Sequence, residues 1–265
     1  MEILSETVLE GKQSKIETIF TQIKRSFIIT KKDLRIYYNK PPVLIQGILF
    51  PIILFIALTL GRNVQSIYLI SGMMGMIIFL TSTSIGPIVF PWESMRKTFE
   101  RLITCPISVK TILLGSMWSS FIYGIAFSSI PLVLGAIFLG LSININLLLI
   151  IFGMIIAGLA FSSFSLILSV PSSSTPGSTM VFTVLIKFPL VFMTPLFTSI
   201  VLTPISYISP LTYFIDIINV GLGDLSAFGQ MGILIDAFVL LGFGLCFLFL
   251  AFALHEKTLE RRFRG

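Results

Sequence analysis

Two long tracts without a single charged residue constrain this chain more than any other feature of its sequence. One runs from Asn63 to Trp92 and the other from Thr111 to Ile186. Each tract is long enough to hold apolar helices of about 20 residues, the length that crosses a bilayer. Over the whole chain 55% of the residues are hydrophobic, 11% are charged, and the mean hydropathy is +1.00. Soluble domains do not have this composition, so the sequence predicts an all-α membrane protein.

Turn-forming residues and charges divide the apolar sequence into six segments. Two divisions, residues 140–146 and 171–177, carry no charge and are recognised only by turn-forming residues such as Gly, Pro, Ser and Asn. The predicted transmembrane helices lie near residues 43–60, 66–89, 111–139, 147–169, 178–200 and 231–254. We expect them to form one transmembrane domain over residues 1–265. A cleaved signal peptide is not expected, because a polar and charged stretch precedes the first apolar run.

The distribution of basic residues predicts the orientation of the chain. Of the 18 Lys and Arg residues, eight precede the first span, four lie in the loop 90–110, and four lie in the tail 255–265. Positively charged loops stay on the cytoplasmic side of a membrane. Both termini and the loop 90–110 are therefore predicted to be cytoplasmic and the connection 201–230 external, in a multi-pass protein of the cell membrane. The net charge of +6 reflects this topology and not nucleic-acid binding.

An apolar stripe lies within the N-terminal segment 1–42. It consists of residues that recur at helical spacing, namely Ile16, Ile19, Phe20, Ile23 and Phe27. Lys24 and Arg25 border the stripe. This pattern predicts an amphipathic helix that lies along the inner leaflet in contact with lipid. The alternative is a helix that packs against a soluble partner.

The sequence lacks the residue patterns of an enzyme. It has no Gly-x-x-x-x-Gly-Lys-Ser/Thr loop that could hold a nucleotide, so any ATP must be handled by another subunit. The single histidine, His255, lies at the inner end of the last predicted span, and no carboxylates cluster inside the predicted spans. The sequence places no His or Lys base next to the serines of the spans. The two cysteines, Cys105 and Cys246, support neither a disulfide framework nor a metal site. We expect no metal or cofactor to be bound by this chain.

The loop 90–110 is unusually rich in charge for this sequence. Glu93 stands four residues before Lys97, and Lys97 four before Arg101, a spacing that supports a helix. The sequence predicts a short amphipathic helix ended by Pro106, with Phe99 among its exposed apolar residues. Such a helix either is solvated or docks into a groove of a soluble protein.

The external connection contains a second distinctive segment, residues 203–224. It is interrupted by prolines and contains Tyr207 and Tyr213. We expect short helices half buried at the outer surface, and the alternative is a plain interfacial connection.

At these two segments the sequence resembles the permease subunit of type-2 ABC exporters. Residues 98–108, Thr-Phe-Glu-Arg-Leu-Ile-Thr-Cys-Pro-Ile-Ser, resemble the coupling-helix segment of that family. Residues 209–216, Ser-Pro-Leu-Thr-Tyr-Phe-Ile-Asp, resemble the segment before its last span, and residues 32–42 resemble its entry to the first span. The sequence departs from the family pattern at Lys97, where glycine is frequent, at Ser209, where asparagine is frequent, and at Asn219, where arginine is frequent.

The resemblance implies a transport subunit and not an enzyme. It implies a homodimer or heterodimer of permeases in the lipid bilayer, bound to cytoplasmic ABC ATPase subunits that carry ATP and Mg²⁺. Contact with the ATPase would fall to Glu93, Arg96, Thr98, Phe99, Glu100, Arg101, Leu102 and Pro106. The resembling external segment contains Pro210, Tyr213 and Asp216. The alternative function is an ATP-independent channel or secondary carrier, for which Asp236 is the only candidate ion-coupling acid inside a predicted span.

One basic residue lies well inside a predicted span. Lys187 must snorkel, pair or face water, because an isolated charge in the bilayer is unfavourable. Pro189 and Pro195 follow it and are expected to kink or break the helix. These three residues are candidates for the translocation pathway, and a structural role for Lys187 is an equal alternative.

Overall fold

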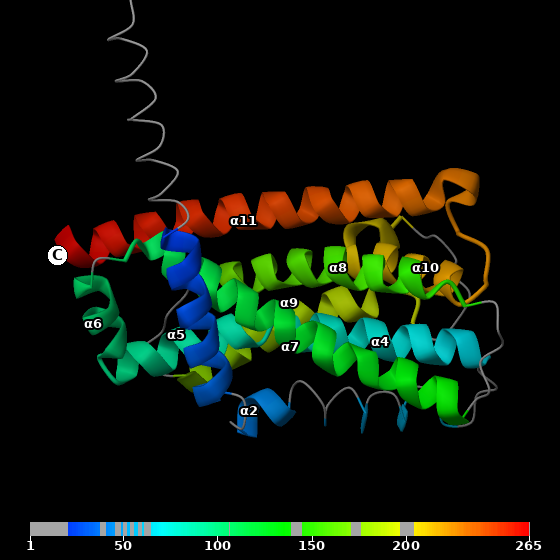
Figure 1. Ribbon diagram of the computed structural model, residues 1–265, viewed down its shortest axis with the longest axis horizontal. Helices are drawn as coiled ribbons and strands as arrows, with labels where there is room; N and C mark the ends of the chain where they lie inside the picture. The colour runs from blue at the N-terminus through cyan, green and yellow to red at the C-terminus, as the bar shows by residue number, and fades with distance from the viewer. Residues whose placement is uncertain are drawn as a thin grey trace, which may run out of the picture.

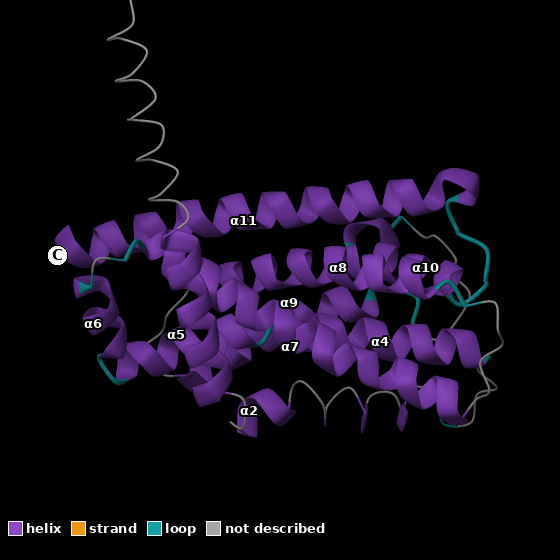
Figure 2. Cartoon of the chain, viewed as in Figure 1, coloured by secondary structure: helices purple, strands orange, loops and turns teal. Residues whose placement is uncertain are grey.

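The computed structural model describes residues 21–37, 41–45, 65–105, 107–138, 145–170, 176–196 and 204–264, together with isolated positions between 49 and 60. In these residues the regular structure is helical throughout and no strand occurs (Figure 2). Within this part of the chain, four segments are long and apolar enough to cross a membrane, namely Ser66–Met95, Val109–Ile137, Leu147–Leu168 and Gly229–Thr258. The all-α membrane class predicted from the sequence is confirmed. Half of the predicted first span, 43–60, lies outside the described residues; the short helix α2, Pro41–Leu44, covers its beginning.

The second predicted span consists of two helices, α4 (Ser66–Ser82) and α5 (Ile85–Met95). They are separated at Thr83 and Ser84, where the Thr83 hydroxyl donates to the Phe79 carbonyl at 2.6 Å. Hydroxyls that bond to preceding carbonyls bend helices in this way. The predicted end at residue 89 was wrong, because α5 continues to Met95 with Pro91 inside it. The loop expected at 90–110 is therefore helical in its first part.

The next three helices follow the predicted breaks. They are α7 (Val109–Phe138), α8 (Leu147–Leu168) and α9 (Pro176–Phe192). The two uncharged divisions are confirmed, and Asn146 caps α8 by accepting a hydrogen bond from the Leu149 amide at 3.1 Å. Helix α9 is shorter than predicted: it continues through Pro189 and ends before Pro195.

The last span is longer than predicted. Helix α11, Gly232–Arg264, has 33 residues and includes nearly all of the segment 255–265, which was expected to be a tail. The charged residues after 254 therefore continue the helix, since Lys, Glu and Arg are good helix formers.

The segment predicted to be external forms the 3-10 helices η2 (Ser206–Ile208) and η3 (Gly229–Met231) and, between them, helix α10 (Pro210–Gly221). The expectation of half-buried helices was wrong for α10, whose residues from Pro210 to Asn219 are all buried. The helix packs against α4, α8 and α11. Glycines make room for it, because Ile215 would lie 2.9 Å from a Cβ at Gly75 of α4 and Ile217 would lie 2.7 Å from one at Gly153 of α8.

Figure 1 shows how the helices are arranged along the molecule. Helix α6 (Thr98–Thr104) and the C-terminus lie at one end, and α10 with the chain that leads into α11 lies at the opposite end. The helix of residues 21–37, drawn in blue, runs across the bundle near the α6 end and not along it (Figure 1).

Candidate functional site

A tight corner joins α5 to α6 at the end of the bundle that carries the basic residues. Helix α5 ends at Met95, and Lys97 adopts a left-handed conformation with φ 55° before α6 begins at Thr98. Lys97 has the one positive φ of a residue other than glycine in the described chain. The left-handed residue turns the chain sharply, so α6 starts directly beside the end of α5.

Helix α6 is fixed to the bundle by contacts on both sides of this corner. The Thr98 hydroxyl donates to the Glu93 carbonyl at 3.2 Å. Leu102 is half buried and packs against the apolar cluster that contains Ile29, Phe90 and Leu113. The helix ends at Thr104, so a short helix before Pro106 is confirmed. The prediction that Glu93, Lys97 and Arg101 share this helix was wrong, because Glu93 belongs to α5 and Lys97 lies at the corner. A displacement of α6 would therefore also move α5.

A buried ionic group connects α5 to the helix of residues 21–37. Glu93 is 3% exposed and pairs with Lys32, whose Nζ also lies 3.1 Å from Asp33 Oδ1. Burial lowers the pKa of Lys32, but the carboxylates of Asp33 and Glu93 outweigh this effect and raise it overall. Burial raises the pKa of Asp33 to about 6, against the opposing effect of Lys32. Lys32 therefore lies as a cation between the carboxyl groups of Asp33 and Glu93.

The helix of residues 21–37 buries polar as well as apolar residues. Its buried residues include Ser26, Thr30 and Asp33, and the Thr30 hydroxyl donates to the Gly115 carbonyl of α7 at 2.9 Å. Its exposed residues include the apolar Phe27 and Ile28, which are 50% and 64% exposed, beside the charged Lys24, Lys31 and Arg35. A helix that turns apolar residues away from its own protein is stable against lipid and not against water.

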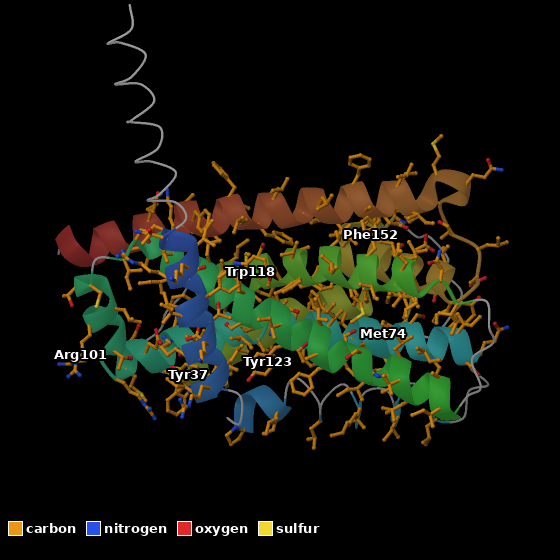
Figure 3. The ribbon with its side chains drawn as sticks, viewed as in Figure 1. Tyr37, Met74, Arg101, Trp118, Tyr123 and Phe152 are labelled. Carbon is orange, nitrogen blue, oxygen red and sulfur yellow. The ribbon has the colours of Figure 1, made fainter. Side chains whose placement is uncertain are left out.

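A groove of about 290 Å³ lies between this helix and the corner. It is lined by Lys32, Ile36, Tyr37, Glu93, Arg96, Thr98, Arg101, Leu102 and Cys105. Arg96 lies over the Trp92 ring, 5.3 Å from its centroid. Arg101 is exposed, and Figure 3 shows its side chain projecting from the outer edge of α6. The rim thus presents two guanidinium groups that form no ion pair with any described residue.

The structure brings together five of the eight residues predicted to contact an ATPase. Glu93, Arg96, Thr98, Arg101 and Leu102 all line the groove. The side chains of Phe99 and Glu100, and the whole of Pro106, lie outside the described residues. Sequence reasoning assigned no role to Lys32, Asp33 and Tyr37. The resemblance of residues 32–42 singled out their segment, but no local signal could have shown that it meets the corner, because Lys32 and Glu93 are 61 positions apart in the chain.

The residues predicted at the external segment lie at the opposite end of the bundle. Pro210 occupies the start of α10, where the amide hydrogen that proline lacks would have no hydrogen-bond partner within the helix. The Tyr213 hydroxyl donates to the Tyr207 carbonyl at 3.0 Å, and the Tyr213 ring stacks on Phe228 at 5.5 Å between centroids. Asp216 accepts a hydrogen bond from the Ala227 amide at 3.0 Å. These contacts fold the connection 222–231 back onto α10.

Lys187 is buried on the face of α9 that packs against α5. It is 1% exposed, and its Nζ donates to the Ser84 hydroxyl at 3.0 Å, at the break between α4 and α5. None of the ion pairs in the described chain includes it.

The stability with which the helix of residues 21–37 packs against the bundle is expected to depend on pH through Asp33. A folded-state pKa of about 6, above the ordinary value of 3.8, means that the folded protein binds the proton more tightly than the unfolded chain does. The stabilisation is present below about pH 4 and is lost as the pH rises through about 6. Amide exchange of this helix, corrected for intrinsic rates, is expected to be slower at the acidic end. In Asp33→Asn the corrected rate should not change with pH across this window, and a persisting change would assign the effect to another group.

The helices described above define a multi-pass membrane protein with a charged corner helix between two spans. In the described residues no group of three or more His, Cys, Asp and Glu side chains could hold a metal ion. Residues 19–222 match the family described as ABC-2 type transporter, and the chain belongs to that family. No curated protein matches the chain significantly. The protein is the membrane subunit of an ATP-driven exporter, and the ATPase is a separate partner subunit.

Proposed function

We propose that the ATPase subunit acts on the corner formed by α5, α6 and the helix of residues 21–37. The main support for this proposal is that all three elements are in contact. Thr98 of α6 forms a hydrogen bond with Glu93 of α5, and Glu93 forms an ion pair with Lys32. On this proposal Arg96 and Arg101 on the groove rim contact the ATPase, together with Phe99, Glu100 and Pro106. Glu93 and Leu102, which face inward, transmit the movement to the bundle. A rigid element between two sites can couple their states.

The proposed topology has six spans, with both termini and α6 in the cytoplasm of the cell. It is supported by the position of the C-terminus and α6 at one end of the bundle and of α10 at the other (Figure 1). It is also supported by the basic residues near α6, such as Lys97, Arg101 and Lys257. The outward apolar face of the helix 21–37 supports its position on the inner leaflet.

A translocation pathway in a dimer of such permeases is proposed to run along α9. Its residues Val181 and Leu185 are 71% and 70% exposed in the single chain, as a surface that faces a pathway or a second copy would be. Pro189 and Pro195 lie in or just after this helix. The burial of Lys187 favours its structural role over direct contact with the transported molecule.

The ATPase contact is tested by reversing a charge on the groove rim. In the purified complex, Arg101→Glu is expected to reduce copurification of the ATPase subunit about tenfold, because a rim cation would become an anion in the interface. The matched control is Lys257→Glu, an exposed residue of α11 outside the groove at the same end of the molecule. Equal recovery of the ATPase with both variants would contradict the proposed contact.

Lys187→Met is expected to leave the folded protein at least as stable as the unaltered chain. Methionine fills similar space, and a buried cation is removed from surroundings in which it has a hydroxyl partner but no described ion pair. Thermal denaturation in detergent measures this stability, and Ser84→Ala is the companion variant for the lost hydrogen bond. Transport and ATP hydrolysis in reconstituted complex should also be retained. A loss of transport with unchanged stability would instead return Lys187 to the pathway.

A further inference from the structure

Two carboxyl groups meet inside the protein at the end of the bundle opposite α6. Asp216 of α10 is 1% exposed and Asp236 of α11 is 0% exposed. The Ser226 hydroxyl, which donates to Asp216, lies against Gly232 of α11, one helical turn before Asp236, and the Asp216 carboxyl group acts on that of Asp236. Neither carboxyl group forms an ion pair with a Lys, Arg or His among the residues that the structure describes.

The two carboxyl groups have different hydrogen-bond partners. Asp216 accepts from the Ser226 hydroxyl at 2.6 Å and from the Ala227 amide at 3.0 Å. In the described chain, neither oxygen of Asp236 accepts a hydrogen bond from a protein donor. Two donors stabilise a negative charge on Asp216, whereas nothing comparable stabilises one on Asp236.

The elements around Asp236 supply no cation among the residues described. Helix α11 packs against α8, α10, η3 and the edge of α7. Helix α8 and η3 contain no titratable residue, and from α10 the groups that face Asp236 are Asp216 and Tyr213. The basic residue of α7, Lys110, pairs with Glu256 of α11, and Tyr123 of α7 packs in the separate cluster with Tyr37. The described environment of the pair therefore contains no cation.

Two ionised carboxylates in contact repel each other strongly in such surroundings, so one of them must hold a proton or a cation must bridge them. We propose that Asp216 and Asp236 form a proton-binding site that holds one proton. The proton is covalently attached to an Asp236 oxygen, and this O–H donates to an ionised Asp216 oxygen. The assignment to Asp236 follows from the donors that already serve Asp216.

The bound proton joins three parts of the outer end. Asp216 belongs to α10, its donors Ser226 and Ala227 belong to the connection before α11, and Asp236 belongs to α11. Release of the proton would leave two negative charges in contact and separate α10 from α11. The site therefore holds the outer end closed while the proton is bound. This inference goes beyond the role of α6 and does not depend on it.

Infrared spectroscopy of the purified protein at neutral pH tests the site. The unaltered protein is expected to show the carbonyl band of a protonated carboxylic acid, and Asp236→Asn should lack it. The matched control is Asp224→Asn, a nearby acid in the same connection that interacts with Tyr68 and not with the pair, and it should retain the band. No band in the unaltered protein, or a band that persists in Asp236→Asn, would overturn the proposal. A band that appears only after removal of metal ions would also overturn it, because a cation would then hold the pair.

A second measurement shows whether the proton keeps the outer end closed. The variant Ala227→Cys is treated with a membrane-impermeant maleimide, either alone or combined with Asp236→Asn. Asparagine keeps the size of the side chain and the bond to Asp216 but cannot ionise. Labelling of both proteins accelerates at alkaline pH because the cysteine forms a thiolate. Beyond this shared rise, we expect labelling to be at least severalfold faster in the single variant, which retains Asp236, than in the double variant. Equal acceleration in both proteins would contradict the closing role.

Discussion

Glu93→Lys is expected to abolish the connection between α5 and the helix of residues 21–37. The substitution places a second ammonium group beside Lys32 at a position that is 3% exposed. Removing one partner of a buried ion pair costs about 3–5 kcal/mol, and a like charge adds repulsion to that loss. Little folded protein should be recovered, and any that is recovered should not couple ATP hydrolysis to transport. Recovery by size-exclusion chromatography and ATP hydrolysis of the reconstituted complex measure the two effects.

The charge-swapped double variant distinguishes a specific pair from a general intolerance of change. Lys32→Glu combined with Glu93→Lys again places one cation among two acids, because Asp33 is unchanged. It is expected to restore much of the recovery lost in the single variant, as a double-mutant cycle detects. Glu93→Gln should have a smaller effect, since Lys32 retains Asp33. Normal recovery and coupling in Glu93→Lys would show that the pair does not hold the two helices together.

Gly115→Leu is expected to displace the helix of residues 21–37 from α7. A Cβ at this position would lie 2.7 Å from the Ile29 Cβ and 2.8 Å from the Ser26 carbonyl oxygen, so the helix itself must shift. The shift would also break the bond from Thr30 to the Gly115 carbonyl. Overpacking of this kind costs on the order of 1–3 kcal/mol. Faster amide exchange in residues 21–37 and weaker coupling of ATP hydrolysis to transport are the expected results.

The control for this variant is a glycine in a different environment. At Gly242 of α11 a Cβ would meet no atom within 4 Å, so Gly242→Leu adds the same side chain without a clash. Its amide exchange in residues 21–37 should match that of the unaltered protein. Equal protection of this helix in both glycine variants would show that the close contact at Gly115 does not determine its position.

Lys97, at the corner before α6, shows what the sequence alone could and could not explain about one residue. The position of Lys97 is one where the resembling family often has glycine, and in the structure its φ is 55°. A left-handed residue other than glycine costs about 1–2 kcal/mol, which explains why glycine is suited to this corner. The resemblance located the departure, but only the backbone conformation supplied its physical reason.

The sequence by itself determined the features that depend on neighbouring residues. The uncharged tracts fixed the apolar spans, the residues of 140–146 and 171–177 fixed the breaks around α8, and Pro106 marked the end of α6. These features follow from helix length, turn chemistry and the missing amide hydrogen of proline, all of which act locally. The extent of α5 was misjudged because a proline inside a helix, here Pro91, gives the same local signal as the start of a loop.

Only the tertiary structure decided which distant residues meet. The pair of Lys32 and Glu93 joins two separate helices, the burial of α10 depends on space left by glycines of α4 and α8, and Asp236 meets Asp216 because α11 packs against α10. None of these contacts leaves a periodicity or motif in the sequence. Their free energy comes from burial and desolvation, which depend on the packing of segments that are far apart in the chain.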